Sequence, residues 1–89
     1  MTDYSLLARK LRALRREVGL TQEQVAIKSG IGMKTISSFE TGSRTSAIKL
    51  WQLKQIAEVY GLNEARLLTW SVDHLVSHVH ENFWKVLPQ

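Results

Sequence analysis

The residues of this chain that could hold a metal ion are few, and the best placed are histidines near its C-terminal end. His74 and His78 are four residues apart, so they lie on one side of a helix, with Glu81 three residues further on. Such a pair binds zinc when a third ligand converges on it. Because the chain has no cysteine, a complete site would need ligands from a partner chain. We therefore expect no metal site.

The chain is equally poor in groups for enzyme chemistry. It has no cysteine nucleophile and no paired carboxylates at a useful spacing. The Gly30-x-Gly32 sequence lacks the third glycine and the preceding strand of a phosphate-binding loop. A chain of 89 residues also buries too little surface to build a deep catalytic cleft. We expect no catalytic residues and no cofactor, and we interpret the chain as a non-enzymatic protein.

Basic residues are concentrated in the first part of the chain. Residues 1–55 hold ten Lys and Arg residues against four Asp and Glu residues, a net charge of +6. Residues 56–89 hold two against four, a net charge of −2. This distribution is typical of a protein whose first part meets a polyanion. A solvated basic helix on any soluble protein would give the same charge. Charge alone therefore does not distinguish a polyanion-binding protein from an ordinary soluble one.

Local signals predict two short helices joined by a turn. Thr21 and Gln24 form a capping box, which predicts the start of a helix over about residues 22–29. Gly30 follows in a tight turn, where glycine accepts a positive φ at little cost. Another short helix is predicted over residues 33–40. Two short helices joined by a glycine-containing turn are the unit that places one helix in the major groove of DNA.

Helices are also predicted on both sides of this unit. Leucines at helical spacing predict a helix over about residues 4–18. A fourth helix is predicted over about residues 47–59, with Thr45 or Ser46 as its cap, and Asn63 is expected to cap a fifth. No strand-like alternation of apolar and polar residues is present. The sequence therefore predicts an all-α fold.

The chain carries no sign of membrane insertion or export. It has no run of about 18 apolar residues, so no membrane-spanning helix is predicted. Its N-terminus lacks the apolar core and cleavage site of a secretory signal. The absence of cysteine fits a reducing compartment. We expect a cytoplasmic protein that does not contact a membrane.

Residues 20–42 have the sequence LTQEQVAIKSGIGMKTISSFETG, and recognisable motifs continue on both sides of this segment. The LTQ entry to the second helix, the turn glycine, the FE-x-G exit from the third helix and the LxxIAEVYGL fourth helix occur in order. Over about residues 9–68 these motifs resemble the Cro/C1-type (XRE) helix-turn-helix family. The resemblance implies a five-helix, lambda-repressor-like domain over residues 1–69. It also implies a recognition helix at about residues 33–40 that binds double-stranded DNA.

The resemblance further implies roles for individual residues. Base contacts are implied for the outward residues of the recognition helix, Met33, Lys34, Ser37 and Ser38. Phosphate contacts are implied for Gln22, Thr35, Ser43, Arg44 and Thr45. Lys34 is the best single candidate, because its ammonium group can donate to guanine O6 and N7. Gln22 would bind phosphate at the start of a helix, where the helix dipole favours an anion.

One pair of matching residues has a structural role in the family. Arg15 and Glu40 match an ion pair between the first helix and the end of the third, which would orient the recognition helix. Gly32 departs from the family pattern, because relatives usually have Ser or Thr there, and a potential phosphate or base donor is lost. The outward face also has few amides and arginines. Specificity would then depend on DNA shape, on water or on few contacts.

After Leu68 the resemblance ends, and residues 70–89 form a C-terminal extension. Its apolar residues recur at the spacing of an amphipathic helix. They are Val72, Leu75, Val76, Val79, Phe83 and Val86. Because a five-helix core is complete without this helix, we expect the stripe to form a homodimer interface. Packing of the stripe on its own subunit and binding of another protein partner are the alternatives.

These observations predict a sequence-specific, DNA-binding transcriptional regulator, most simply a repressor that binds an inverted repeat as a homodimer. The competing interpretation is an antitoxin-type module that neutralises a partner toxin and regulates its own operon, because such antitoxins often share this fold. The C-terminal helix separates the two. A stripe hidden in a homodimer favours the repressor, whereas an exposed apolar stripe favours a toxin or another protein partner.

Overall fold

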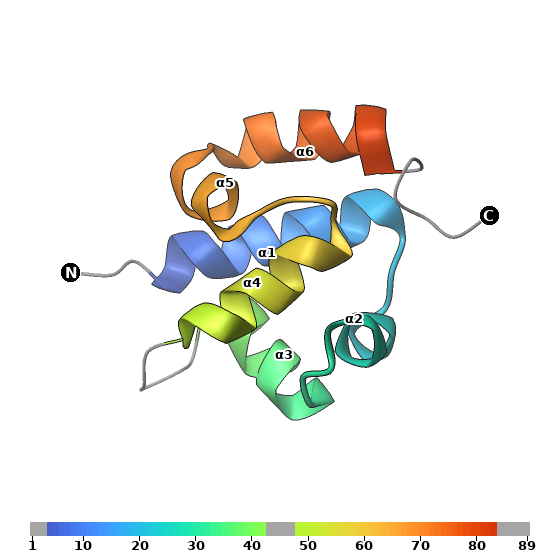
Figure 1. The fold of residues 1–89 in the computed structure, drawn as a ribbon, viewed down its shortest axis with the longest axis vertical. Helices are drawn as coiled ribbons and strands as arrows, with labels where there is room; N and C mark the ends of the chain where they lie inside the picture. Colours follow the sequence, from blue (N-terminus) through green and yellow to red (C-terminus); the bar gives the residue numbers. More distant parts are fainter. Residues whose placement is uncertain (1–3, 43–47, 84–89) are drawn as a thin grey trace.

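The structure is a computed structural model that describes residues 4–42 and 48–83. Its elements are α1 (Tyr4–Val18), α2 (Gln22–Ser29), α3 (Met33–Thr41), α4 (Leu50–Val59), α5 (Glu64–Thr69) and α6 (Val72–Asn82). Within these residues there is no strand, and no helix has the length and apolar character to cross a bilayer. Figure 1 shows α2, α3 and α4 on one side of α1 and α6 on the other. The all-α prediction is confirmed.

The capping signals act as predicted at the helix ends. Thr21 Oγ1 accepts from the backbone N–H of Gln24 at 3.1 Å, and Gln24 Oε1 accepts from the N–H of Thr21 at 2.8 Å. Gly30 ends α2 with a φ of 74°. Asn63 Oδ1 accepts from the N–H of Arg66 at 2.8 Å, at the start of α5. These bonds satisfy amides that have no partner within their helices, and they fix where the chain turns.

The fourth helix begins later than predicted. Lys49 precedes it in an extended conformation, and α4 starts at Leu50. The Gln52 side chain accepts from the N–H of Lys49 at 3.0 Å, so a residue inside the helix supplies the cap. The predicted caps Thr45 and Ser46 lie outside the described residues.

One apolar core joins all six helices. Its buried members include Leu7, Leu11, Leu14, Val25, Ile36, Phe39, Leu53, Ile56, Leu67, Leu75 and Val79. The first helix lies at the centre of this core, because α1 packs against α3 on one side and against α6 on the other. A position between two partners explains why Leu7, Leu11 and Leu14 of α1 are buried almost completely.

The stripe of α6 packs on its own chain, which corrects our expectation that it forms a dimer interface. Leu75, Val79 and Phe83 are 0, 1 and 8 % exposed within the single chain. The ring centroid of Phe83 lies 6.4 Å from that of Tyr60. These three side chains are core residues and are not available to a second subunit.

The helix α6 packs on its own chain because α1 has apolar residues on two sides, and both sides must be shielded from water. The other helices leave one side open, and α6 runs beside α1 in the same direction to cover it (Figure 1). Five helices are therefore not a complete core in this chain. Val72 and Val76 remain partly exposed, and Val86 lies outside the described residues.

Leu75→Ala is expected to lower the free energy of unfolding by about 2–5 kcal/mol, because it leaves a cavity at a fully buried position. Ile27→Ala is the control. Ile27 is 74 % exposed on α2, so its replacement should change stability by no more than about 0.5 kcal/mol. Urea unfolding followed by circular dichroism measures both variants. Wild-type stability in Leu75→Ala would show that α6 is not part of the core.

Candidate nucleic-acid interface

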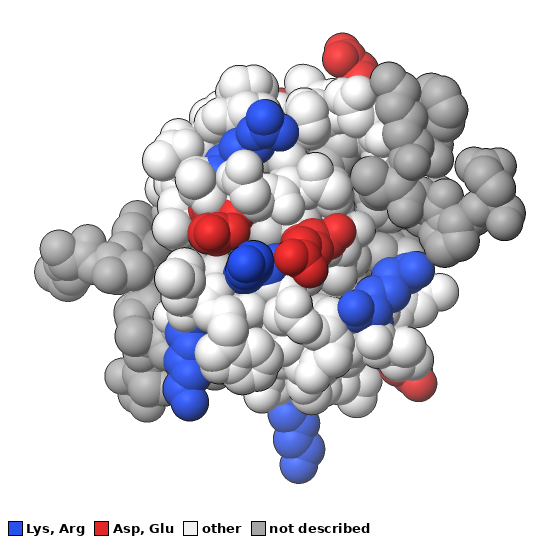
Figure 2. Space-filling view, in the orientation of Figure 1, with Lys and Arg blue, Asp and Glu red and all other residues white. Residues whose placement is uncertain are grey.

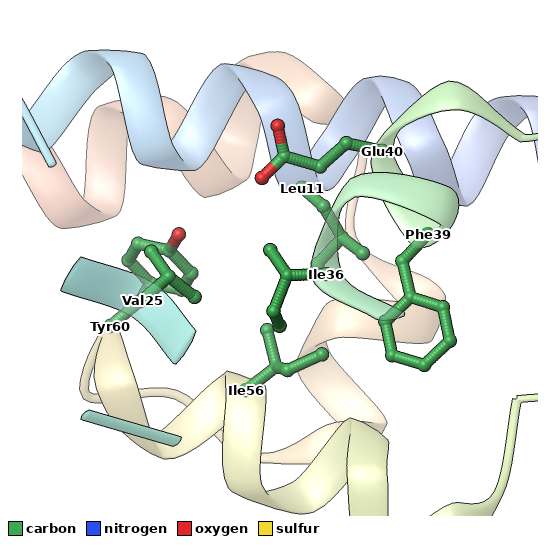
Figure 3. Close-up of a pocket in the computed structure, with 7 residues that line it drawn as sticks. All are labelled: Leu11, Val25, Ile36, Phe39, Glu40, Ile56 and Tyr60. Atoms are coloured by element: carbon green, nitrogen blue, oxygen red, sulfur yellow. The ribbon is translucent and has the colours of Figure 1, made fainter. Parts of the chain in front are cut away.

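The helices α2 and α3 pack against each other across the turn that joins them. Val25 of α2 is buried together with Ile36 and Phe39 of α3. Inside the turn, Ser29 Oγ accepts from the N–H of Ile31 at 3.3 Å. Figure 3 shows Ile36 pointing from α3 toward the core side chains behind it. One face of α3 is thereby anchored in the core, and the opposite face meets solvent.

The exposed face of α3 carries most of the residues predicted to contact bases. Met33 is 52 % exposed, Lys34 is exposed and Ser37 is half-buried. Ser37 is four residues from Met33 and three from Lys34, so the three side chains lie on one side of the helix. The Ser38 hydroxyl donates to the carbonyl of Thr35 at 2.9 Å, so its proton is used within the helix.

Gln22 stands at the start of α2, as predicted, but its side chain already has a partner. Its Nε2 donates to Glu40 Oε1 at 3.4 Å. A side-chain amide has two N–H donors, so one remains for a phosphate. The backbone N–H of Gln22, in the first turn of α2, has no intrahelical acceptor and adds a second donor.

The carboxylate of Glu40 joins three helices. Glu40 is 2 % exposed, and Arg15 Nε lies 2.9 Å from both of its oxygens. Arg15 also donates to the carbonyl of Leu20 at 3.1 Å, just beyond the end of α1. With Gln22 approaching from α2, this ion pair ties the end of α3 to both preceding helices.

Arg12 is a further partner of α3 that the sequence analysis missed. Its NH1 donates to the main-chain carbonyl of Glu40 at 2.6 Å. Carbonyls in the last turn of a helix lack intrahelical partners and carry partial negative charge, so a cation there is stabilising. The available signal was the spacing of three residues between Arg12 and Arg15, which places both groups on one side of α1.

Lys10 makes a similar contact with the end of α5. It is 5 % exposed, and its Nζ donates to the carbonyls of Leu67 and Leu68 at 3.1 Å each. Loss of hydration on burial lowers the pKa of the Lys10 ammonium group. Lys10 and Arg12 therefore both bind main-chain carbonyls within the fold.

The surface around α2 and α3 has a modest basic excess. Figure 2 shows Lys and Arg side chains projecting from the lower part of the molecule, where Figure 1 places these helices. Their exposed charged residues are Lys28 and Lys34 against Glu23. The predicted phosphate-contacting residues of the following loop, Ser43, Arg44 and Thr45, lie outside the described residues.

A small cavity lies behind α3. It is lined by Leu11, Val25, Ile36, Phe39, Glu40, Ile56 and Tyr60 (Figure 3). Its volume of about 10 Å³ leaves room for at most a single water molecule, so it is too small for a cofactor. Burial, together with the Glu40 carboxylate, raises the pKa of Tyr60, while Arg15 acts in the opposite direction.

The histidines of α6 contact other side chains. The His74 ring stacks on Trp70 with centroids 3.9 Å apart, and His78 meets the edge of the same ring at 5.2 Å. His80 Nδ1 lies 2.6 Å from Glu17 Oε1, which links α6 to the end of α1. No group of three metal-ligating side chains is found in the part of the chain that the structure describes.

Glu40→Gln is expected to lower the free energy of unfolding by about 3 kcal/mol, because it leaves the partly buried Arg15 without its counter-charge. Replacing both partners, Arg15→Met with Glu40→Leu, should recover part of this loss, since no unpaired charge then remains. Urea unfolding measures both variants. An exposed ion pair contributes at most about 1 kcal/mol. If Glu40→Gln lowers the free energy of unfolding by less than this, the Glu40 carboxylate does not hold the three helices together.

Tyr60 is expected to make the fold sensitive to alkaline pH. Its folded pKa is raised, so above about pH 10 the unfolded side chain loses its proton while the folded one keeps it. Stability must therefore fall as pH rises through this range. In Tyr4→Phe, Tyr60 is the sole tyrosine, and tyrosinate absorbance should appear only as the helical circular dichroism is lost. Tyrosinate in a chain that is still helical would refute this expectation.

Comparison with known proteins places these features in a family. The helix-turn-helix domain family matches residues 6–70, which include all helices from α2 to α5 and most of α1. The chain is 36 % identical over 69 residues to an uncharacterized HTH-type transcriptional regulator, y4dJ, of Sinorhizobium fredii. That alignment covers 78 % of this chain and 87 % of that protein. No solved structure matches the chain significantly. With its α2–turn–α3 unit inside the matched segment, this chain belongs to the helix-turn-helix domain family.

Proposed function

We propose that this chain is a sequence-specific, DNA-binding regulator of transcription, a non-enzymatic Cro/C1-type repressor of the cytoplasm. The observation that carries the proposal is that α3 is exposed at its beginning and held by hydrogen bonds near its end. Met33 and Lys34 point into solvent at its beginning, while Arg12 and Arg15 hold Glu40 near its end. Membership of the helix-turn-helix family and the relative named as a transcriptional regulator support the same function.

In this proposal α3 enters the major groove of double-stranded DNA. Lys34 donates to guanine O6 and N7, and Met33 packs on a thymine methyl group. Ser37 and Ser38 complete the base contacts. Gln22 binds a phosphate through its second side-chain N–H and its backbone amide. The remaining phosphate contacts that we propose are made by Thr35, Ser43, Arg44 and Thr45.

The regulator acts as a homodimer on an inverted repeat. A single recognition helix spans only a few base pairs, and two such helices about 34 Å apart contact one face of the duplex. Symmetry of the protein then matches symmetry of the DNA site. A dimer bound over a promoter would exclude RNA polymerase, which makes repression the simplest outcome.

The antitoxin-type function has less support. It requires an exposed apolar segment that a toxin can cover, and α6 was the candidate. Leu75, Val79 and Phe83 of that helix are buried against the rest of the chain. The stripe is therefore not available to a toxin, and we do not propose this function.

The proposal is tested by selection from a random library of double-stranded DNA. The wild-type chain should enrich an inverted repeat. Lys34→Ala should relax one position in each half-site and weaken binding by about 1–3 kcal/mol. Lys54→Ala is the matched control, because Lys54 is an exposed lysine of α4 that we place in no DNA contact, and it should leave the selected sequence unchanged.

Salt dependence completes the test. The logarithm of the binding constant should fall against the logarithm of salt concentration with a slope of about −0.9 per phosphate contact. Failure of the wild-type chain to enrich any sequence, with weak binding at moderate salt, would contradict the proposed function.

A further inference from the structure

An open groove runs between the N-terminal half of α1 and the junction of α5 with α6. Its volume is about 510 Å³, and its walls include Leu6 and Arg9 of α1, Leu68 of α5 and Asp73 of α6. Leu6 and Leu68 are 38 % and 50 % exposed, so two large apolar side chains meet solvent beside two charged groups. The groove contains no residue of α2 or α3, and it is separate from the DNA-contacting surface proposed above.

The walls of the groove are held in place without a partner. Lys10 joins α1 to the end of α5 through the carbonyls of Leu67 and Leu68. Trp70, which also lines the groove, is stacked on His74. A preformed surface loses less conformational entropy on association than a mobile one. The groove is therefore suited to binding as it stands.

The charges of the groove are complementary across its two walls. Arg9 and Asp73 are both exposed, and neither forms an ion pair with another residue that the structure describes. The third charged residue, Lys10, has its ammonium group turned to the carbonyls of α5. A two-fold axis that brings Arg9 of one copy to Asp73 of the other forms this ion pair twice, because an isologous interface exchanges every contact. The exposed leucines would lie between the two ion pairs.

We propose that this groove is where a second copy of the chain docks, so that α1, α5 and the start of α6 form the homodimer interface. The inference rests on the proposed function, which requires two copies on an inverted repeat. In Figure 1 the beginning of α1 and α5 lie at the left of the molecule, whereas α2 and α3 lie at its lower end. Association through the groove therefore leaves both recognition helices exposed to DNA.

Another exposed apolar pair is less suited to this contact. Leu50 and Trp51 of α4 are 65 % and 53 % exposed, but Lys49 and Lys54, both exposed, lie beside them in the sequence. A two-fold contact there would bring lysines of both copies together, and like charges oppose association. Trp51→Ser is therefore a matched control for changes in the groove.

The test is the oligomeric state of the full chain, measured by sedimentation equilibrium over the micromolar range. The wild-type chain and Trp51→Ser should form the same dimer. Arg9→Glu and Asp73→Arg should each raise the dimer dissociation constant about tenfold or more, because each change alters two symmetric contacts. The double variant Arg9→Glu with Asp73→Arg should restore dimerisation, since it reverses both charges. Circular dichroism should show wild-type helix content in all variants.

Three results would overturn the proposal. They are a monomeric wild-type chain, a dimer unaffected by either single charge reversal, and a double variant no better than the single ones. DNA selection run in parallel separates this inference from the proposed function. A chain that dimerises through the groove but enriches no DNA sequence contradicts the proposed function and leaves the interface in place. A chain that enriches an inverted repeat while groove variants dimerise normally contradicts the interface alone.

Discussion

The ion pair between Arg15 and Glu40 is the interaction on which the position of α3 depends. The Glu40 carboxylate is 2 % exposed, and Arg15 Nε lies 2.9 Å from both of its oxygens. A buried charge without a partner is strongly destabilising, so these two groups must stay together in the folded chain. Because Gln22 also contacts the carboxylate, the starts and ends of three helices meet at one point. The exposed face of α3 is thus presented in one orientation, which sequence-specific contacts with DNA require.

The basic residues of α1 act mainly within the fold. Arg12 donates to the last turn of α3, and Lys10 donates to the carbonyls at the end of α5. Both contacts place a cation where unpaired carbonyls concentrate negative charge. The positive charge of the N-terminal part of the chain is therefore a poor measure of its attraction to DNA. The described part of the α2–α3 surface has few exposed Lys and Arg side chains. DNA binding would therefore depend more strongly on individual contacts, such as the one proposed for Lys34.

Signals that act over a few residues were sufficient to predict most of the fold. The capping box at Thr21, the turn at Gly30 and the cap at Asn63 depend on hydrogen bonds between near neighbours, and all three are present. The surface against which α6 packs could not be predicted. An amphipathic stripe shows that a helix buries one face, but it does not identify the partner of that face. The contacts of Lys10 and Arg12 were missed for the same reason, since their partners lie far away in the sequence.

The measurement that most directly tests the central claim is amide chemical-shift mapping of the isotope-labelled chain with the duplex enriched by selection. The largest shifts should fall at the start of α2 and along the exposed side of α3, from Gln22 and from Met33 to Ser37. Residues of α6 should remain close to their free values. Shifts centred on α6 or on the groove beside Asp73, with α3 unchanged, would contradict the claim that α3 is the recognition helix.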